Sequence, residues 1–370
     1  MKKTETGKLA LWHSKYKEQL LTGRYINSFM IEPVLGTLSS RFQIESHARS
    51  HEGIPIYKIV AGTGPIKILI WTQMHGNEST GTKAVFDLFR YIENPPEESE
   101  INRLLTACTL IVIPILNPDG ALAYTRVNAQ GIDLNRDAVD HKAPESRYLY
   151  EVLKSEQPDY CFNLHDQRTI FSVGKKNAPA TLSFLAPSED ADRTLTEGRK
   201  KTMSVISAMY HTLKQVLPGQ IGRFTDEFYP TATGDNFQKM GFPTILIEAG
   251  HYTGDYAREK VRFYNFLALL AGIRFIASPK RSTAFASYFK IPENKTLRLD
   301  IIYKNIILED SGERTDVGIL FKEVLTADKI SFQPTIARIE NLSAYNADKI
   351  VDKEGKTFKS KKSLEALVKK

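Results

Sequence analysis

The stretch that decides the fold spans residues 66–78 and reads Ile66-Lys67-Ile68-Leu69-Ile70-Trp71-Thr72-Gln73-Met74-His75-Gly76-Asn77-Glu78. Its first six residues form an apolar, β-branched run of strand length, and near-continuous apolarity is typical of a strand that is covered on both faces. Reactive side chains follow at once. Because ligands of open α/β sheets bind beyond the carboxyl ends of the strands, this stretch predicts a strand that leads into a functional site.

Three further runs have the same character, and they cover residues 109–116, 160–164 and 243–247. Segments of helix length with apolar residues at 3.6-type spacing lie between or after the runs, at residues 80–93, 199–217 and 264–273. Strands that alternate with helices predict an α/β fold in which helices cover both faces of a central sheet.

The pattern changes near residue 280, where short β-type runs broken by Gly and Asp begin. We expect four parts along the chain. They are a helix and loop extension (1–44), a catalytic domain (45–278), a small β-rich domain (279–351) and a basic tail (352–370).

Composition narrows the functional classes. The formal charge of +7 is concentrated at the end of the chain, because residues 352–370 hold seven Lys against three acids, a net +4 that leaves +3 for the rest. A solvated tail explains this better than nucleic-acid binding, since only Phe358 interleaves with the lysines. No run approaches the roughly 20 apolar residues of a membrane helix. Cys108 and Cys161 both lie in apolar runs, which predicts buried thiols and a reducing cytoplasm.

Metal-binding side chains follow two of the predicted strands. His75 and Glu78 are three residues apart after the first strand, and His165 closes the strand at 160–164. A catalytic zinc takes three ligands of this kind and keeps one position open. Glu248 follows the strand at 243–247 and would converge on the same edge. A structural reading stays open, in which the histidine makes a local hydrogen bond and Glu78 begins a helix.

The loop after the strand at 109–116 is rich in polar residues. It runs through Asn117-Pro118-Asp119-Gly120 to Gly131-Ile132-Asp133-Leu134-Asn135-Arg136 and includes Arg126. Its arginines predict anion sites, because a guanidinium matches a carboxylate with two parallel hydrogen bonds. Alternatively, the arginines pair with Asp119 or Asp133 and hold the loop in place.

Together these motifs resemble the zinc carboxypeptidases of the funnelin type over roughly residues 45–278. The resemblance rests on His75-Gly76-Asn77-Glu78, the two motifs of the polar loop, His165 at a strand end and Glu248 after a late strand, in this order. It implies a mixed, mostly parallel sheet of about eight strands with helices on both faces. The C-terminal β-rich part has no counterpart that we identify.

The resemblance also implies roles for individual residues. His75, Glu78 and His165 would hold one zinc ion per chain and Glu248 would be the general base. Arg126 would polarise the scissile carbonyl, while Asn135 and Arg136 would grip the terminal carboxylate of the substrate. Tyr229 is the candidate for the mobile tyrosine over the substrate, although its spacing to Glu248 departs from the usual one. Gly234 would stand at the base of the side-chain pocket, where the lack of an acidic group predicts no preference for basic residues.

The implied activity is removal of a C-terminal residue from a peptide or amide with a free carboxylate. Two alternatives remain: a related zinc amidase or deacylase that acts on an acylated amino acid or a cell-wall peptide, and an inactive relative that only binds peptides. His141 and His251 stand outside the motifs and are predicted to be structural. Asp137 replaces the asparagine that many members have after Arg136, which could reshape the carboxylate site.

Overall fold

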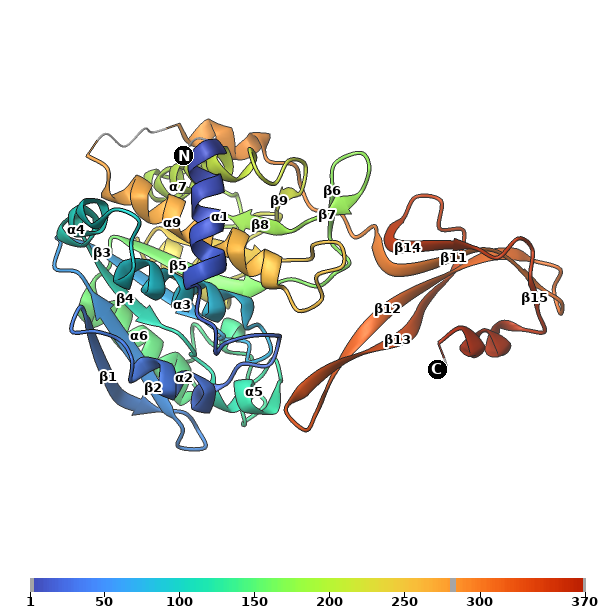
Figure 1. The fold of residues 1–370 in the computed structure, drawn as a ribbon, viewed down its shortest axis with the longest axis horizontal. Helices are drawn as coiled ribbons and strands as arrows, with labels where there is room; N and C mark the ends of the chain where they lie inside the picture. Colours follow the sequence, from blue (N-terminus) through green and yellow to red (C-terminus); the bar gives the residue numbers. More distant parts are fainter. Residues whose placement is uncertain (1–2, 280–283, 369–370) are drawn as a thin grey trace.

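A computed structural model describes residues 3–279 and 284–368. Its main body is built on an eight-stranded mixed sheet with strand order β1-β2-β4-β3-β5-β10-β8-β9 (Figure 1). Strands β4, β3, β5 and β10 run parallel to one another and β8 runs parallel to β9, whereas the pairs β1–β2, β2–β4 and β10–β8 are antiparallel. The strands are β1 (Phe42–Arg49), β2 (Pro55–Ala61), β3 (Ile66–Thr72), β4 (Cys108–Ile113), β5 (Tyr160–Asp166), β8 (Leu182–Leu185), β9 (Ile221–Arg223) and β10 (Thr244–Ala249).

Helices cover both faces of this sheet, as the near-continuous apolar runs predict. Ile68 and Ile70 of β3 belong to one hydrophobic cluster, whereas Leu69 and Trp71 belong to another on the opposite face. This alternation follows from the two-residue period of a strand. The helices are α1 (Lys3–Tyr16), α2 (Ser28–Leu35), α3 (Thr80–Glu93), α4 (Glu98–Ala107), α5 (Pro118–Ala123), α6 (Pro144–Glu156), α7 (Glu197–Leu213), α8 (Thr233–Lys239) and α9 (Glu259–Ala277). The mixed α/β fold predicted from the sequence is therefore confirmed.

The N-terminal helix α1 is attached to the body by a buried ionic network. His13 Nε2 lies 2.7 Å from Asp87 Oδ2 of α3, and Arg262 of α9 donates to both oxygens of the same carboxylate. The first residues of the chain therefore pack against the same helices that cover the sheet.

A second sheet projects from the body (Figure 1) and has the order β13-β12-β11-β14, with β15 paired to β11. Its strands are β11 (Arg298–Leu308), β12 (Arg314–Thr326), β13 (Lys329–Glu340), β14 (Asn346–Asp352) and β15 (Thr357–Phe358). This is the β-rich region expected in the second half of the chain. The boundary predicted near residue 280 falls at residues outside the described ones.

The expectation of a solvated tail after residue 352 needs correction. Residues 357–358 form β15, and a 3-10 helix η3 (Lys361–Leu367) follows. Leu364 is fully buried against the sheet, with Phe358 and Leu367 packed beside it. These apolar side chains are spaced among the lysines, so a charge count alone does not reveal them.

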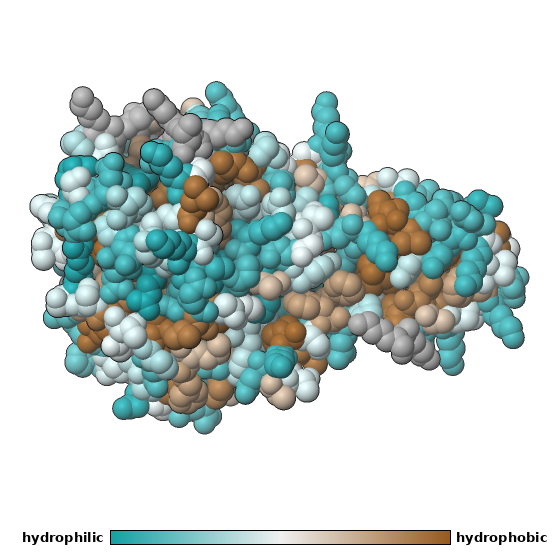
Figure 2. Space-filling model, in the orientation of Figure 1, coloured by the Kyte–Doolittle hydropathy of each residue, from teal (hydrophilic) through white to brown (hydrophobic). Residues whose placement is uncertain are grey.

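Among the described residues, no helix combines the length and apolarity needed to cross a membrane. Figure 2 shows that hydrophilic residues dominate the visible face and that hydrophobic residues lie in scattered groups. Cys108 and Cys161 are both buried thiols, as their apolar surroundings predict.

Candidate metal centre and active site

The turn between β3 and α3 positions the first two predicted metal ligands. The backbone of Gln73 is left-handed (φ 46°) directly after β3, which turns the chain away from the sheet. Gly76 then passes so close to α5 that a Cβ atom on it would lie 1.9 Å from the carbonyl carbon of Gly120. Only glycine fits this close contact. The contact fixes the backbone of the turn at Gly76, between His75 and Glu78.

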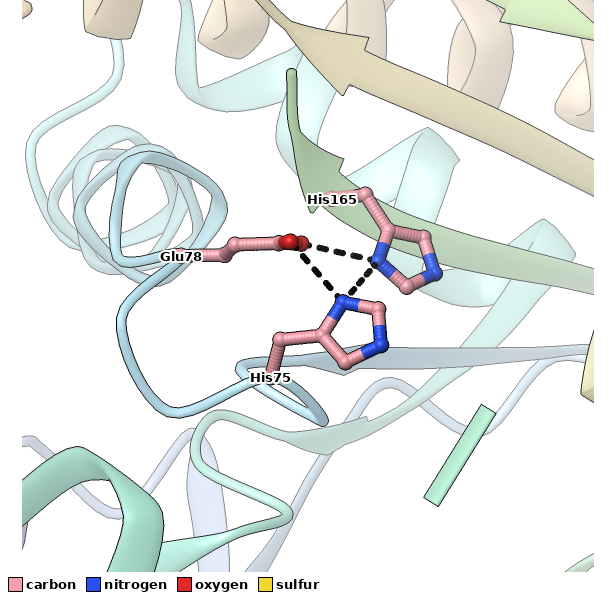
Figure 3. A group of neighbouring side chains, drawn as sticks. All are labelled: His75, Glu78 and His165. Carbon is pink, nitrogen blue, oxygen red and sulfur yellow. Dashed lines mark hydrogen bonds and ion pairs between the residues drawn. The ribbon is translucent and has the colours of Figure 1, made fainter. Parts of the chain in front are cut away.

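The three predicted ligands come together in the structure (Figure 3). Glu78 Oε1 lies 2.8 Å from Nδ1 of His75, and Glu78 Oε2 lies 2.9 Å from Nδ1 of His165. The two Nδ1 atoms are 3.2 Å apart. Ligand nitrogens at about 2.0–2.1 Å from a tetrahedral zinc ion are separated by roughly 3.3 Å, so the spacing of the imidazoles fits this ion.

The hydrogen-bond partner of His75 also fits a role of this histidine as a metal ligand. Asp133 Oδ1 lies 3.1 Å from Nε2 of His75 and, as a carboxylate, accepts a hydrogen bond from it. In the neutral imidazole, Nδ1 then carries a lone pair that faces Glu78 and His165. Electron-pair donors that converge in this way repel each other unless a proton or a metal cation lies between them. The residues present therefore fit a zinc ion.

Asp133 belongs to a motif that the sequence reveals, but only the structure shows this orienting contact. The sequence signal that could have indicated this contact is an acidic residue in a loop at the same sheet edge as His75. His75 and the guanidinium of Arg126 lower the pKa of Asp133 despite its burial, so this carboxylate stays ionised.

The electrostatics of the cluster favour a charged carboxylate at Glu78. Burial alone would raise its pKa, but the charge of His75 and the hydrogen bonds from both imidazoles hold it well below its ordinary value. For His165 burial prevails and lowers the pKa, which favours the neutral imidazole that a metal requires.

Arg126 lies beside the cluster and also fixes its own loop. Its Nη1 is 3.2 Å from Nδ1 of His75 and 3.5 Å from Oε1 of Glu78. Its Nε donates to Asp133 Oδ2 at 2.9 Å, which is the loop-fixing pair considered as an alternative. The loop-fixing pair is therefore present, and Asp133 holds the guanidinium at a place where it also reaches the two predicted metal ligands.

Glu248 stands next to His165 in the sheet, since the two residues are paired across β10 and β5. Paired positions of neighbouring strands present their side chains on the same face, so the Glu248 carboxylate shares the face of the cluster. Burial, together with the charges of Glu78 and Asp166, raises its pKa well above the ordinary value. No hydrogen bond to this carboxylate occurs within the described part of the chain.

The predicted substrate-binding residues form a second group. Asn135 and Arg136 lie in the 3-10 turn η1 (Leu134–Arg136), and Asn135 Oδ1 accepts from the backbone N–H of Thr233 at 3.1 Å, which ties η1 to α8. The guanidinium of exposed Arg136 stands 5.4 Å from the ring centre of Tyr229, which is half exposed. Gly234 is buried at the start of α8. The structure thus brings these four residues to one side of the site.

Asp137 has a local structural role. It is buried and accepts backbone hydrogen bonds from Lys142 at 2.9 Å and from Ala143 at 2.8 Å. It therefore holds the turn before α6 and makes no hydrogen bond or ion pair with the Arg136 side chain in the described structure.

The two histidines outside the motifs do not join the metal cluster. His141 stacks near Tyr150, with ring centres 4.4 Å apart. His251 Nε2 lies 2.7 Å from Asp348 Oδ2 of β14, so it links the body to the second sheet.

A cavity of about 630 Å³ opens directly beside Glu78 and Arg126. One of its walls comes from the second sheet, where Phe321, Lys322 and Glu323 of β12 and Phe332 of β13 line it. The sequence contains no motif that places the C-terminal strands at the site, because such contacts depend on how the two sheets are oriented.

Comparison with known proteins agrees with this geometry. The family description "Zinc carboxypeptidase" matches residues 30–266 of the chain. Carboxypeptidase M of Mus musculus is 31% identical over 158 residues, which are 38% of this chain and 33% of that protein. Probable carboxypeptidase 2 of Arthroderma benhamiae is 27% identical over 115 residues, which are 30% of this chain and 21% of that protein. The matches thus span about a fifth to a third of the length of these relatives.

Solved structures share the fold. A metallo-carboxypeptidase from Burkholderia cenocepacia superposes with a TM-score of 0.53 at 17% identity, over 67% of this chain and 70% of that one. Carboxypeptidase A from Helicoverpa armigera gives a TM-score of 0.54 at 15% identity, over 76% and 82%. The second sheet, which begins at Arg298, lies beyond the residues that the family description matches.

Proposed function

The chain belongs to the zinc carboxypeptidase family, and from this premise we propose that it is a zinc-dependent carboxypeptidase that hydrolyses the bond next to a free C-terminal carboxylate. The observation that carries the proposal is the convergence of His75, Glu78 and His165, whose ligand atoms all lie within 4.8 Å of one another. Glu248 on the neighbouring strand adds a group that metal binding alone does not need.

Each residue would have a distinct task. When bound, zinc lowers the pKa of a water molecule in its open position to about 7. Glu248 would take the proton of the attacking water, and its raised pKa supports this role because a base must hold the proton briefly. Glu248 would then pass the proton to the leaving amine. The fixed guanidinium of Arg126 would stabilise the negative charge that develops on the carbonyl oxygen.

The terminal carboxylate of the substrate would meet Asn135 and Arg136. Arg136 is exposed and its guanidinium forms no ion pair within the described structure, so it is available for an incoming anion. Tyr229 beside it would cover the bound residue. The base of the side-chain pocket would be formed near Gly234, where a Cβ atom would lie 3.3 Å from Pro187. Buried Asn163, whose amide atoms have no hydrogen-bond partner among the described residues, lies close by.

The substrate class is tested with one peptide in two forms, with a free and with an amidated C-terminus. Amidation removes the charge that Arg136 would meet, and a hydrogen bond to a charged group contributes about 1.5–3 kcal/mol. We expect release of the single C-terminal residue from the free peptide and a rate lower by well over tenfold for the amide. Mass spectrometry of the products identifies the bond that is cut.

Equal cleavage of the two forms, or internal fragments, would overturn the carboxypeptidase assignment and favour the amidase or deacylase alternative. A purified protein that binds zinc but cleaves neither form would favour the alternative of a relative that only binds peptides.

A further inference from the structure

The cavity beside the metal cluster is shared by the two sheets. Its volume of about 630 Å³ is within the range of roughly 300–1,000 Å³ that small-molecule sites occupy. Glu78 and Arg126 line it, whereas Asn135, Arg136, Tyr229 and Gly234 do not. If the terminal carboxylate binds Arg136, as the proposed function states, the cavity receives the part of the substrate upstream of the scissile bond.

The wall from the second sheet is held firmly in place. Glu323 of β12 is ion-paired with Arg24 at 2.9 Å and accepts a hydrogen bond from the hydroxyl of Tyr124. The ring of Tyr256 packs against Phe321 and Phe332, with ring centres 5.1 and 5.3 Å apart. With the pair of His251 and Asp348, these contacts join the second sheet to several loops of the body.

The charges around the cavity are unbalanced. Its three carboxylates are already engaged, because Glu323 pairs with Arg24, Asp166 lies 3.0 Å from Arg258, and Glu78 faces the imidazoles. Five cationic side chains line the same space, and they are Arg24, Arg126, Arg168, Arg258 and Lys322. Within the described residues, Arg168 and Lys322 are the two of these that form no ion pair or hydrogen bond. Both are exposed.

We propose that the C-terminal sheet supplies one wall of the subsite for the upstream part of the substrate, and that Lys322 with Arg168 selects peptides that carry a negative charge there. Lys322 comes from the second sheet and Arg168 from the segment after β5, and both line the cavity. An anionic group bound in this part of the cavity would meet two cations that have no acidic partner among the residues that the structure describes. The inference rests on the proposed carboxypeptidase function and adds the chemistry of the substrate.

The test compares isosteric peptides that differ in one charge. Acetyl-Glu-Phe is measured against acetyl-Gln-Phe, and acetyl-Glu-Ala-Phe against acetyl-Gln-Ala-Phe, so that the charge is tried at two positions. An exposed ion pair contributes about 0.2–1 kcal/mol, so two such pairs predict a preference of about fivefold in kcat/KM for Glu in at least one series. The preference should shrink at 1 M salt, where the Debye length is about 3 Å.

Two variants then assign the preference to its residues. Lys322→Gln and Arg168→Gln should each move the ratio of Glu to Gln peptides toward one. Lys349→Gln is the matched control, because this lysine is an exposed residue of the same sheet that does not line the cavity. It should leave the ratio unchanged.

The outcomes separate the two proposals. Release of phenylalanine from all peptides with a ratio of one, or a ratio that neither variant alters, would overturn the selection by Lys322 and Arg168 while leaving the carboxypeptidase intact. No release of phenylalanine from any peptide would overturn the proposed function and this inference with it.

Discussion

At the scale of single residues, the site depends on a chain of contacts that ends at the metal ligands. Asp133 accepts from Nε2 of His75 and from Nε of Arg126, so one carboxylate orients both an imidazole and a guanidinium. Groups that orient metal ligands in this way raise the basicity of the imidazole and hold the ring in place. The identity of a few side chains therefore decides whether the site can bind a metal.

The ligand assignment predicts metal loss. His75→Ala or His165→Ala removes one of three protein ligands, and we expect both purified variants to contain little zinc by elemental analysis while the unaltered chain contains about one ion. His47→Ala serves as the control, because the His47 side chain is 79% exposed and lies on β1. Full zinc content in both site variants would show that other residues hold the metal.

A pH effect is expected at Asp235, whose pKa burial raises to about 6. Because the folded-state pKa lies above the ordinary value of about 3.9, folding favours the protonated acid. Its contribution to stability is complete below about pH 4 and is lost as the pH rises through 6. Asp235→Asn stays neutral and can still accept from the Tyr229 N–H.

When both proteins are measured without metal, the free energy of unfolding of Asp235→Asn should therefore rise by about 1–3 kcal/mol relative to that of the unaltered protein as the pH increases from 4.5 to 8. Denaturant unfolding of the two proteins at both pH values measures this change. A difference that stays constant over the range contradicts the raised pKa.

At the scale of elements, the sequence predicted more of the body than of its surroundings. The four apolar runs are β3, β4, β5 and β10, which form the centre of the sheet, because strands buried on both faces need continuous apolar residues. The outer strands β1, β2, β8 and β9 escaped prediction. β1 is largely exposed and β9 is only three residues long, so neither has a distinctive apolar run.

The turn between β3 and α3 carries a prediction of its own. Gly76→Ala would place a Cβ atom 1.9 Å from backbone atoms of α5, so the turn or the helix must shift. We expect a loss of about 1–3 kcal/mol in stability together with weaker zinc binding, measured by unfolding and metal titration. Gly7→Ala in α1 is the control, because nothing lies within 4 Å of the added atom. Unchanged zinc affinity in Gly76→Ala would show that the geometry of this turn is not needed to position the metal ligands.

At the scale of the whole molecule, residues far apart in the chain meet at the candidate site. The parallel strands bring His75, His165 and Glu248 to one edge, and this convergence could be predicted because parallel neighbours end on the same side. The position of the second sheet against the body could not be predicted from the sequence. It depends on pairs such as Arg24 with Glu323, which are about 300 residues apart and carry no local pattern. The packing of Phe358 and Leu364 was not predicted either, because their apolar partners lie on β11 and β12, about 40–60 residues earlier in the chain.

The most direct test of the account is the zinc content and activity of Glu248→Gln, measured on one sample with a peptide that has a free C-terminus. The amide keeps the shape of the carboxylate but cannot accept a proton, and a general base contributes about 10²–10⁴-fold to the rate. We predict about one zinc per chain, as in the unaltered protein, and a rate lower by at least a hundredfold. A zinc-loaded variant that retains more than roughly a tenth of the activity would contradict Glu248 as the base and with it the proposed mechanism.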